Sequence, residues 1–204
     1  MHELKEGFGY TFGYAPIKSV ILLLALVSLT GMPYTVLMPV FAREILHGGP
    51  HTYGFLMGAA GLGAFAGAIF LASRRNALGL GKLLTIAAGI FGTGLIFFSF
   101  SHVISLSLLM MVVIGLGMML QMASSNTILQ TLVDDDKRGR VMSFYAMAFM
   151  GMMPFGSLLA GSLADVFGAP VTLAAGGVFC VGGAIFFASK LAEVEKMLGA
   201  ASTP

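Results

Sequence analysis

The sequence predicts an all-α membrane protein with six transmembrane helices. Of its 204 residues, 57% are hydrophobic and 10% are charged, and the mean hydropathy is +0.94. A soluble domain carries about 25% charged residues. The apolar residues form continuous runs, whereas the strands of a membrane barrel alternate apolar and polar residues. Runs of about 20 residues have the helical length needed to cross a hydrocarbon core of about 30 Å.

The six apolar runs follow one another with short separators. They cover residues 17–41, 53–73, 83–100, 103–122, 141–163 and 171–189. Helix breakers such as Pro50 and Gly168 stand in the separators. The first run is too long for the apolar segment of a signal peptide, so we expect it to remain in the mature protein. We expect residues 1–16 to form an interfacial lead-in, 17–189 the six-helix bundle and 190–204 a tail.

The basic residues predict the orientation of the chain. If the amino terminus is placed on one side, that side collects every lysine and arginine except Arg43. Short loops rich in lysine and arginine stay in the cytoplasm. We therefore expect a multi-pass membrane protein with both termini in the cytoplasm. The net charge of +2 is spread over short loops, which argues against nucleic-acid binding.

No arrangement of residues predicts an enzyme, a metal site or a cofactor. His47 and His51 are four residues apart, but Gly48, Gly49 and Pro50 between them prevent a helix that would aim both rings at one metal. The lone Cys180 excludes an internal disulfide framework. Three successive aspartates at 134–136 are expected to form a solvated turn before the fifth helix, because carboxylates favour a helix amino terminus.

Polar residues in the first and fourth helices are candidates for the wall of a substrate pathway. Thr30 and Tyr34 are four residues apart, beside a kink expected at Gly31 and Pro33, although a helical hydroxyl can also bond its own backbone. The fourth helix contributes Gln121, Ser124 and Ser125 on one face and Asn126 and Gln130 on roughly the opposite one. Asn126 and Gln130 either line the pathway or reach interfacial water where the helix extends beyond the bilayer.

Glycines predict where helices approach closely, because small residues let two backbones meet in a membrane. The candidates for helix packing are Gly54, Gly58, Gly63, Gly67, Gly151, Gly156 and Gly161.

The chain resembles the carboxy-terminal six-helix half of a major facilitator superfamily transporter, in the enterobactin-exporter-like branch of transmembrane secretion effectors. PYTVLMPVFAR at 33–43 resembles the seventh helix of that family, and GAIFLASRRNALGLGKL at 67–83 resembles its loop between helices eight and nine. The most specific stretch is residues 129–161, with LQTLVDDDKRGRVMSF and PFGSLLAG. Ser73 stands where the loop motif usually has an acidic residue.

The resemblance implies half of a twelve-helix fold built from 3+3 inverted repeats, with substrate bound between two halves. It also implies a cytoplasmic gate, for which the candidates are Arg74, Arg75, Asp136, Arg138 and Arg140. The resemblance implies the inner (cytoplasmic) membrane of a bacterium. We expect the chain to lie in that lipid bilayer beside a second six-helix half, which is another copy, a separate chain or a missing amino-terminal half.

The expected function is that of a secondary active transporter, which exports a small organic or amphipathic molecule by alternating access. No acidic residue or histidine lies in the middle of a predicted helix, so a proton carrier is expected on the other half. The alternative is a non-transporting assembly partner or a degenerate, truncated transporter half.

Overall fold

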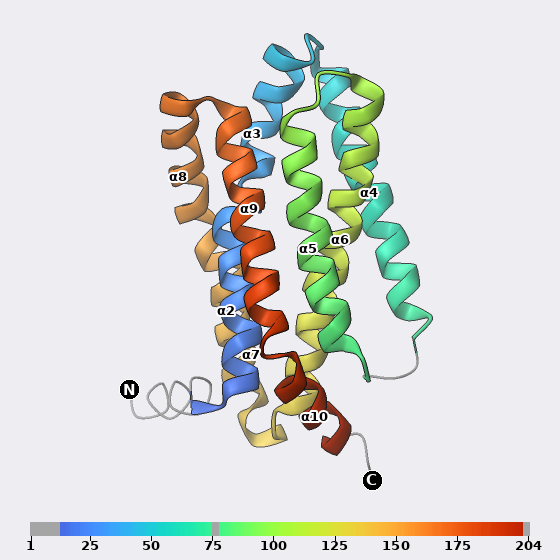
Figure 1. Cartoon of the computed structure of the whole chain (residues 1–204), viewed down its shortest axis with the longest axis vertical. Helices are drawn as coiled ribbons and strands as arrows, with labels where there is room; N and C mark the ends of the chain where they lie inside the picture. Colours follow the sequence, from blue (N-terminus) through green and yellow to red (C-terminus); the bar gives the residue numbers. More distant parts are fainter. Residues whose placement is uncertain (1–12, 75–77, 202–204) are drawn as a thin grey trace.

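The computed structural model describes residues 13–74 and 78–201 and confirms the all-helical fold with six candidate membrane spans (Figure 1). The spans are Ala15–Ile45, Pro50–Ala72, Leu80–Ser99, Ile104–Leu132, Asp135–Phe167 and Ala169–Ala188. No strand occurs within the described residues. The predicted runs therefore mark all six spans.

The first and fifth spans are each divided into three helical pieces. The first consists of α2 (Ala15–Thr30), α3 (Tyr34–Val40) and the π-helical turn η1 (Phe41–Ile45). The fifth consists of α7 (Asp135–Ala146), the π-helical turn η2 (Met147–Gly151) and α8 (Met152–Phe167). The remaining helices are α4 (Pro50–Ala72), α5 (Leu80–Ser99), α6 (Ile104–Leu132), α9 (Ala169–Ala188) and α10 (Leu191–Ala201).

Three helix pairs form the most extensive packing of the bundle. α6 packs along both α4 and α5, and α9 packs along α5. In Figure 1, α5 and α9 stand in front of α6 and α2, while α4 and α8 lie at opposite edges. α4 buries one narrow stripe that includes Leu56, Ala60 and Gly63, and leaves Phe55, Leu62 and Phe65 exposed. The edge helices therefore carry wide apolar surfaces.

Two helices extend beyond the apolar runs that predicted them. α6 continues to Leu132, ten residues past the predicted run, and the fifth span begins at Asp135 rather than at residue 141. Hydropathy marks only the part of a helix inside the hydrocarbon, whereas backbone hydrogen bonding continues into the interface. Asp135 and Asp136 lie in the first turn of α7, where the helix dipole favours carboxylates.

The predicted kink of the first span is confirmed at the turn that separates α2 from α3. Pro33 has no backbone N–H, so the carbonyl of Leu29 receives no hydrogen bond from it. The amide of Met32 donates to Val27 O (3.1 Å) and the amide of Tyr34 donates to Gly31 O (3.1 Å). The regular α-helical hydrogen-bonding pattern of the backbone is thus interrupted within the first membrane span.

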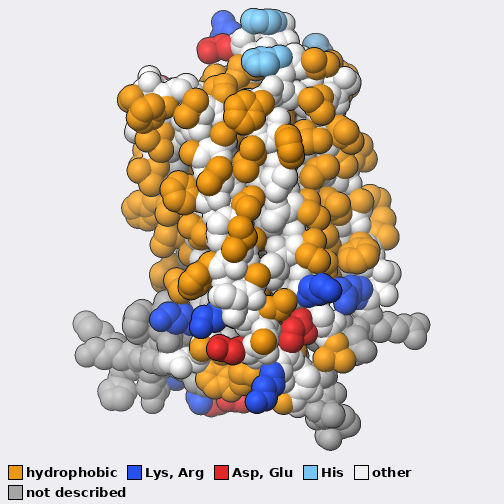
Figure 2. Space-filling view, in the orientation of Figure 1, with side chains coloured by type: hydrophobic (Ala, Val, Ile, Leu, Met, Phe, Trp, Pro, Cys, Tyr) orange, Lys and Arg blue, Asp and Glu red, His pale blue; other side chains and the backbone are white. Residues whose placement is uncertain are grey.

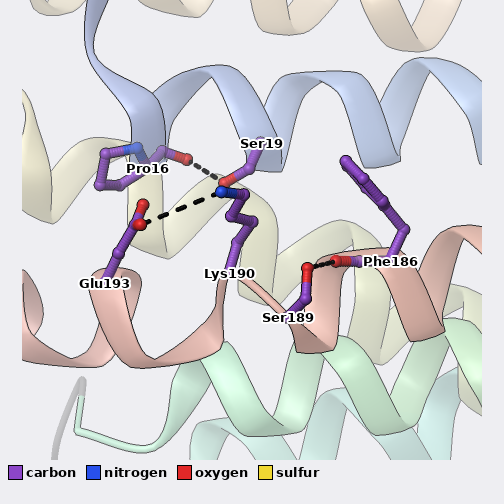
Figure 3. A network of polar contacts seen from close by, with 6 residues as sticks. All are labelled: Pro16, Ser19, Phe186, Ser189, Lys190 and Glu193. Atoms are coloured by element: carbon purple, nitrogen blue, oxygen red, sulfur yellow. Dashed lines mark hydrogen bonds and ion pairs between the residues drawn. The ribbon is translucent and has the colours of Figure 1, made fainter.

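The segment after the sixth span is a docked helix, although the sequence analysis assigned it to a tail. Val194 and Leu198 of α10 are four residues apart and fully buried, and α10 contacts α2, α5 and α6. Figure 3 shows the turn between α9 and α10 beside the first turn of α2, with Lys190 and Glu193 4.0 Å apart. The apolar pair on one face explains why this segment folds against the bundle.

Glu195 of α10 caps the amino terminus of α5. Its carboxylate accepts hydrogen bonds from the amides of Gly79 (3.0 Å) and Lys82 (3.1 Å). Gly79 has φ of 78°, a left-handed conformation that glycine adopts without strain. A helix amino terminus exposes unpaired N–H groups, and a carboxylate there also interacts favourably with the positive end of the helix dipole. α10 therefore supplies the amino-terminal cap of α5, the third span.

We expect Glu195→Ala to lower the free energy of unfolding by about 0.5–2 kcal/mol, the usual cost of losing a helix cap. The matched control is Glu193→Ala, because Glu193 of the same helix is exposed and pairs with Lys190 in the turn before it. Thermal unfolding of the purified protein in detergent, followed by circular dichroism, measures both variants. Equal melting temperatures for the two would contradict the capping role.

Side-chain types are segregated along the long axis of the molecule (Figure 2). A wide hydrophobic band covers the middle, and lysines and arginines gather at the end that carries α10. Arg43, His47, His51 and His102 lie at the other end, where η1 ends and where α4 and α6 begin. This distribution matches a protein whose middle contacts lipid and whose ends contact water.

Candidate functional site: a wall of a substrate pathway

Thr30 and Tyr34 border one cavity of about 160 Å³, between the first span, α8 and α9. Thr30 Oγ1 donates to Leu26 O (2.9 Å) and lies 3.6 Å from the Sγ atom of Cys180. The Tyr34 ring is 4% exposed and packs edge-on against Phe91, with ring centroids 6.2 Å apart. The rest of the lining is apolar apart from Thr172, whose hydroxyl bonds Gly168 O (3.0 Å). The cavity therefore suits apolar groups.

The backbone carbonyls at the kink are covered by glycines of the last two spans. Gly156 of α8 meets the carbonyl of Leu29, and Gly176 of α9 meets the carbonyl of Thr30. A side chain at either glycine would overlap that carbonyl. These close approaches fix α8 and α9 around the kink and shape the cavity that Thr30 and Tyr34 border.

Gln121, Ser124 and Ser125 lie inside the half and not on an open face. Their exposed fractions are 3%, 0% and 0%. Ser125 Oγ donates to the carbonyl of Gln121 (2.7 Å), its own helix. The sequence correctly places the three on one face of α6, but that face is covered by neighbouring helices.

Asn126 and Gln130 lie on a more accessible side of α6 and are hydrogen-bonded to each other. Gln130 Nε2 donates to Asn126 Oδ1. Gln130 is exposed and stands two residues before the end of α6, whereas Asn126 lies one turn deeper and is half-buried. The pair thus leads from the helix end toward the middle of the span.

Tyr145 joins this pair and was missed by the sequence analysis. Its hydroxyl donates to Met122 O (3.2 Å) and lies close to the side chains of Asn126 and Ser125. Tyr145 comes from α7, so its hydroxyl joins the fourth and fifth spans. An aromatic hydroxyl near the polar start of an apolar span was the available signal. The polar wall is defined here as Asn126, Gln130 and Tyr145.

The gate candidates make local contacts in this structure. Arg138 pairs with Asp135 of its own helix (2.6 Å), and Arg74 Nη2 donates to Leu78 O (3.1 Å). Asp136 is exposed in the first turn of α7, and Arg140 is half-buried further along that helix. Arg75 lies outside the described residues. No group of three or more potential metal ligands occurs within the described ranges.

The packing glycines fall into three sets. Gly63 and Gly67 approach the backbone of α6, and Gly156 approaches α2, within the half. Gly151 is in van der Waals contact with the Met147 side chain. A Cβ atom at Gly54, Gly58 or Gly161 would meet open space.

The model of one protein family, described as transmembrane secretion effector, matches residues 1–203. The chain belongs to this family of major facilitator superfamily transporters. Its six spans are consistent with half of the superfamily's fold, as the resemblance implied.

Similar proteins include the staphyloferrin A transporter of Staphylococcus aureus, which is 27% identical over 83% of this chain and 43% of its own length. The uncharacterized MFS-type transporters YfmI and YvqJ of Bacillus subtilis are 24% and 27% identical over 96% and 95% of this chain, and over 49% and 46% of their own lengths. The chain therefore spans about half the length of the curated relatives it matches.

Proposed function

We propose that this chain forms one six-helix half of a secondary active transporter, which exports small organic or amphipathic molecules from a bacterial cytoplasm by alternating access. The family match and the transporter names of its relatives support transport. The observation that carries the pathway is the polar wall, where the Asn126–Gln130 pair of the fourth span lies near Tyr145 of the fifth span, whose hydroxyl bonds the α6 backbone. The second half, which completes the cavity, is another copy, a separate chain or an amino-terminal half.

The chemistry of this half favours uncharged groups of the substrate. Within the described residues, acidic, basic and histidine side chains lie only near the ends of the six spans. The accessible side of the fifth span instead carries Met147 (56% exposed) and Met150 (71% exposed). Thioethers adapt to varied apolar ligands, and amides with hydroxyls fix their orientation. A proton carrier is accordingly proposed on the other half.

A transport assay in inverted bacterial membrane vesicles tests this function. The chain is produced together with the amino-terminal half of the staphyloferrin A transporter, and uptake of ethidium or staphyloferrin A is measured with and without a proton gradient. We expect gradient-dependent uptake that Asn126→Leu abolishes. Ser162→Ala is the control, because Ser162 is exposed and bonds only its own helix. A correctly inserted complex without uptake of either probe would favour the non-transporting assembly partner.

The orientation of the chain is proposed from its charges, with the end that carries α10 in the cytoplasm. In a Cys180→Ala background, an impermeant maleimide added to intact cells is expected to label His51→Cys but not Arg74→Cys. The reason is that the loop at Arg74 is basic and resists translocation, whereas His51 begins α4 at the opposite end. Labelling at Arg74→Cys alone would reverse the orientation.

A further inference from the structure

Three polar atoms are buried between membrane spans without a hydrogen-bond partner among the described residues. They are Ser28 Oγ of α2 and Gln121 Nε2 and Ser124 Oγ of α6. Their residues are 1%, 3% and 0% exposed. Protein interiors pair nearly all such groups, because an unmade hydrogen bond leaves the full desolvation cost. Three unpaired groups in one bundle therefore require an explanation.

Contacts with Phe91 place Ser28 and Gln121 at the same depth. Gly31, at the end of α2, meets the Phe91 ring, and a Cβ atom at Gly117 of α6 would lie 2.7 Å from Phe91 N. Gly31 and Gly117 therefore both lie against one residue of α5, the first against its ring and the second against its backbone, and so at similar depths. α2 and α6 contact each other and run in opposite directions. Ser28, three residues before Gly31, and Gln121, four residues after Gly117, are thus both about one turn closer to the α10 end.

The surroundings of Ser28, Gln121 and Ser124 differ between the side toward the α10 end and the side toward the opposite end of the bundle. Ser124 lies about one further turn along the same face of α6 as Gln121. Toward the α10 end, α6 continues with the polar wall. Toward the opposite end, Phe91, Met111 and Ile114 are fully buried and apolar. The unpaired groups thus lie at the inner end of the polar part of α6.

We propose that Ser28, Gln121 and Ser124 hold water between α2 and α6. A buried water typically makes two to four hydrogen bonds to groups that are otherwise unpaired. The Gln121 amide donates to the water oxygen, and the water donates to the hydroxyl oxygens of the two serines. Water fits this set because all three groups are neutral, while an ion would require charged ligands or several more oxygens.

Bound water gives the contact between these two spans a particular property. A direct side-chain bond across the interface fixes one relative position of the two helices. A water molecule exchanges its bonds among several donors and acceptors, so α2 and α6 keep their polar groups paired at more than one relative position. Ser28, Gln121, Ser124 and their water therefore form a joint between the first and fourth spans, separate from the polar wall.

Water-edited solid-state NMR of the full chain in lipid bilayers tests the site directly. Magnetisation is transferred from water to side-chain amides of ¹⁵N-labelled glutamine, and the spectrum includes Gln121 and the exposed Gln130. We expect Gln121 to receive magnetisation from water although it is buried. A Gln121 signal that builds up only through slow diffusion within the protein, well after that of Gln130, would show a dry core and overturn the proposal.

Two variants measure the bridge itself. Ser28→Ala is expected to cause loss of the water transfer to Gln121 and a lower melting temperature. Combined with Gln121→Met, it should lower the melting temperature by less than the sum of the two single changes, because both remove one bridge. Ser107→Ala is the control, since this buried serine of α6 already pairs with Ser101 Oγ (2.8 Å) and should not affect Gln121. Additive effects, or a higher melting temperature for Gln121→Met, would contradict the water bridge.

Discussion

Gly63→Ala is expected to destabilise the protein by about 3 kcal/mol, the upper end of the usual cost of overpacking. A Cβ atom at Gly63 would overlap the backbone carbonyl of Val112, and one at Gly115 would overlap the carbonyl of Ala60. α4 and α6 therefore touch through both backbones. Neither carbonyl can rotate away without moving its helix, so the added methyl must separate the two spans.

The control for this prediction is Gly58→Ala on the same helix. A Cβ atom there would meet open space, and alanine has a higher helix propensity than glycine. The melting temperature of Gly58→Ala should be unchanged or higher, whereas that of Gly63→Ala should fall by many degrees. The same loss in both variants would show that the α4 and α6 contact is not as close as the structure has it.

Gly156→Val is expected to have the second large effect, on both stability and transport. Its side chain would overlap the carbonyl of Leu29 and press on the Pro33 ring at the kink. We expect α8 to move away from α2, with a loss of about 1–3 kcal/mol. Because α8 lines the cavity beside Thr30 and Tyr34, transport by the assembled protein should also be lost.

Gly161→Val separates this effect from the general cost of valine in a helix. Gly161 lies in the same helix, and its Cβ position is open. Melting temperature and vesicle uptake are measured for both variants at equal membrane insertion. If Gly156→Val retains the uptake and stability of Gly161→Val, the contact with the kink does not position α8.

The six spans and the kink could be predicted from the sequence because their causes are local. An apolar run of sufficient length has one stable arrangement in a bilayer, a helix, and Pro33 interrupts the backbone bonding wherever that helix packs. The end of α6 was placed too early because polar residues such as Gln130 extend a helix without adding hydropathy.

The functional contacts could not be predicted in the same way because they depend on residues far apart in the sequence. Gly58 and Gly63 are flanked in the sequence by similar apolar residues. They differ in packing, because the Val112 carbonyl of α6 lies against Gly63 and not against Gly58. Gln121 was predicted as a candidate for the wall of a substrate pathway, but the covering of its face depends on how α2 and α5 pack against α6. Tyr145 joins the wall through the carbonyl of Met122, a contact that no local pattern reveals.

The π-helical turn η2 changes how substitutions along the fifth span must be interpreted. Tyr145 and Gly156 are eleven residues apart, about three turns, so an uninterrupted α-helix would point both in the same direction. They contact different helices instead, α6 and α2. A π-helical turn accommodates one extra residue and rotates everything beyond it by about 100°. A mutational scan of this span should therefore be plotted on two helical wheels, one up to Ala146 and one from Met152. A single wheel for the whole span would superimpose residues that lie on two different faces.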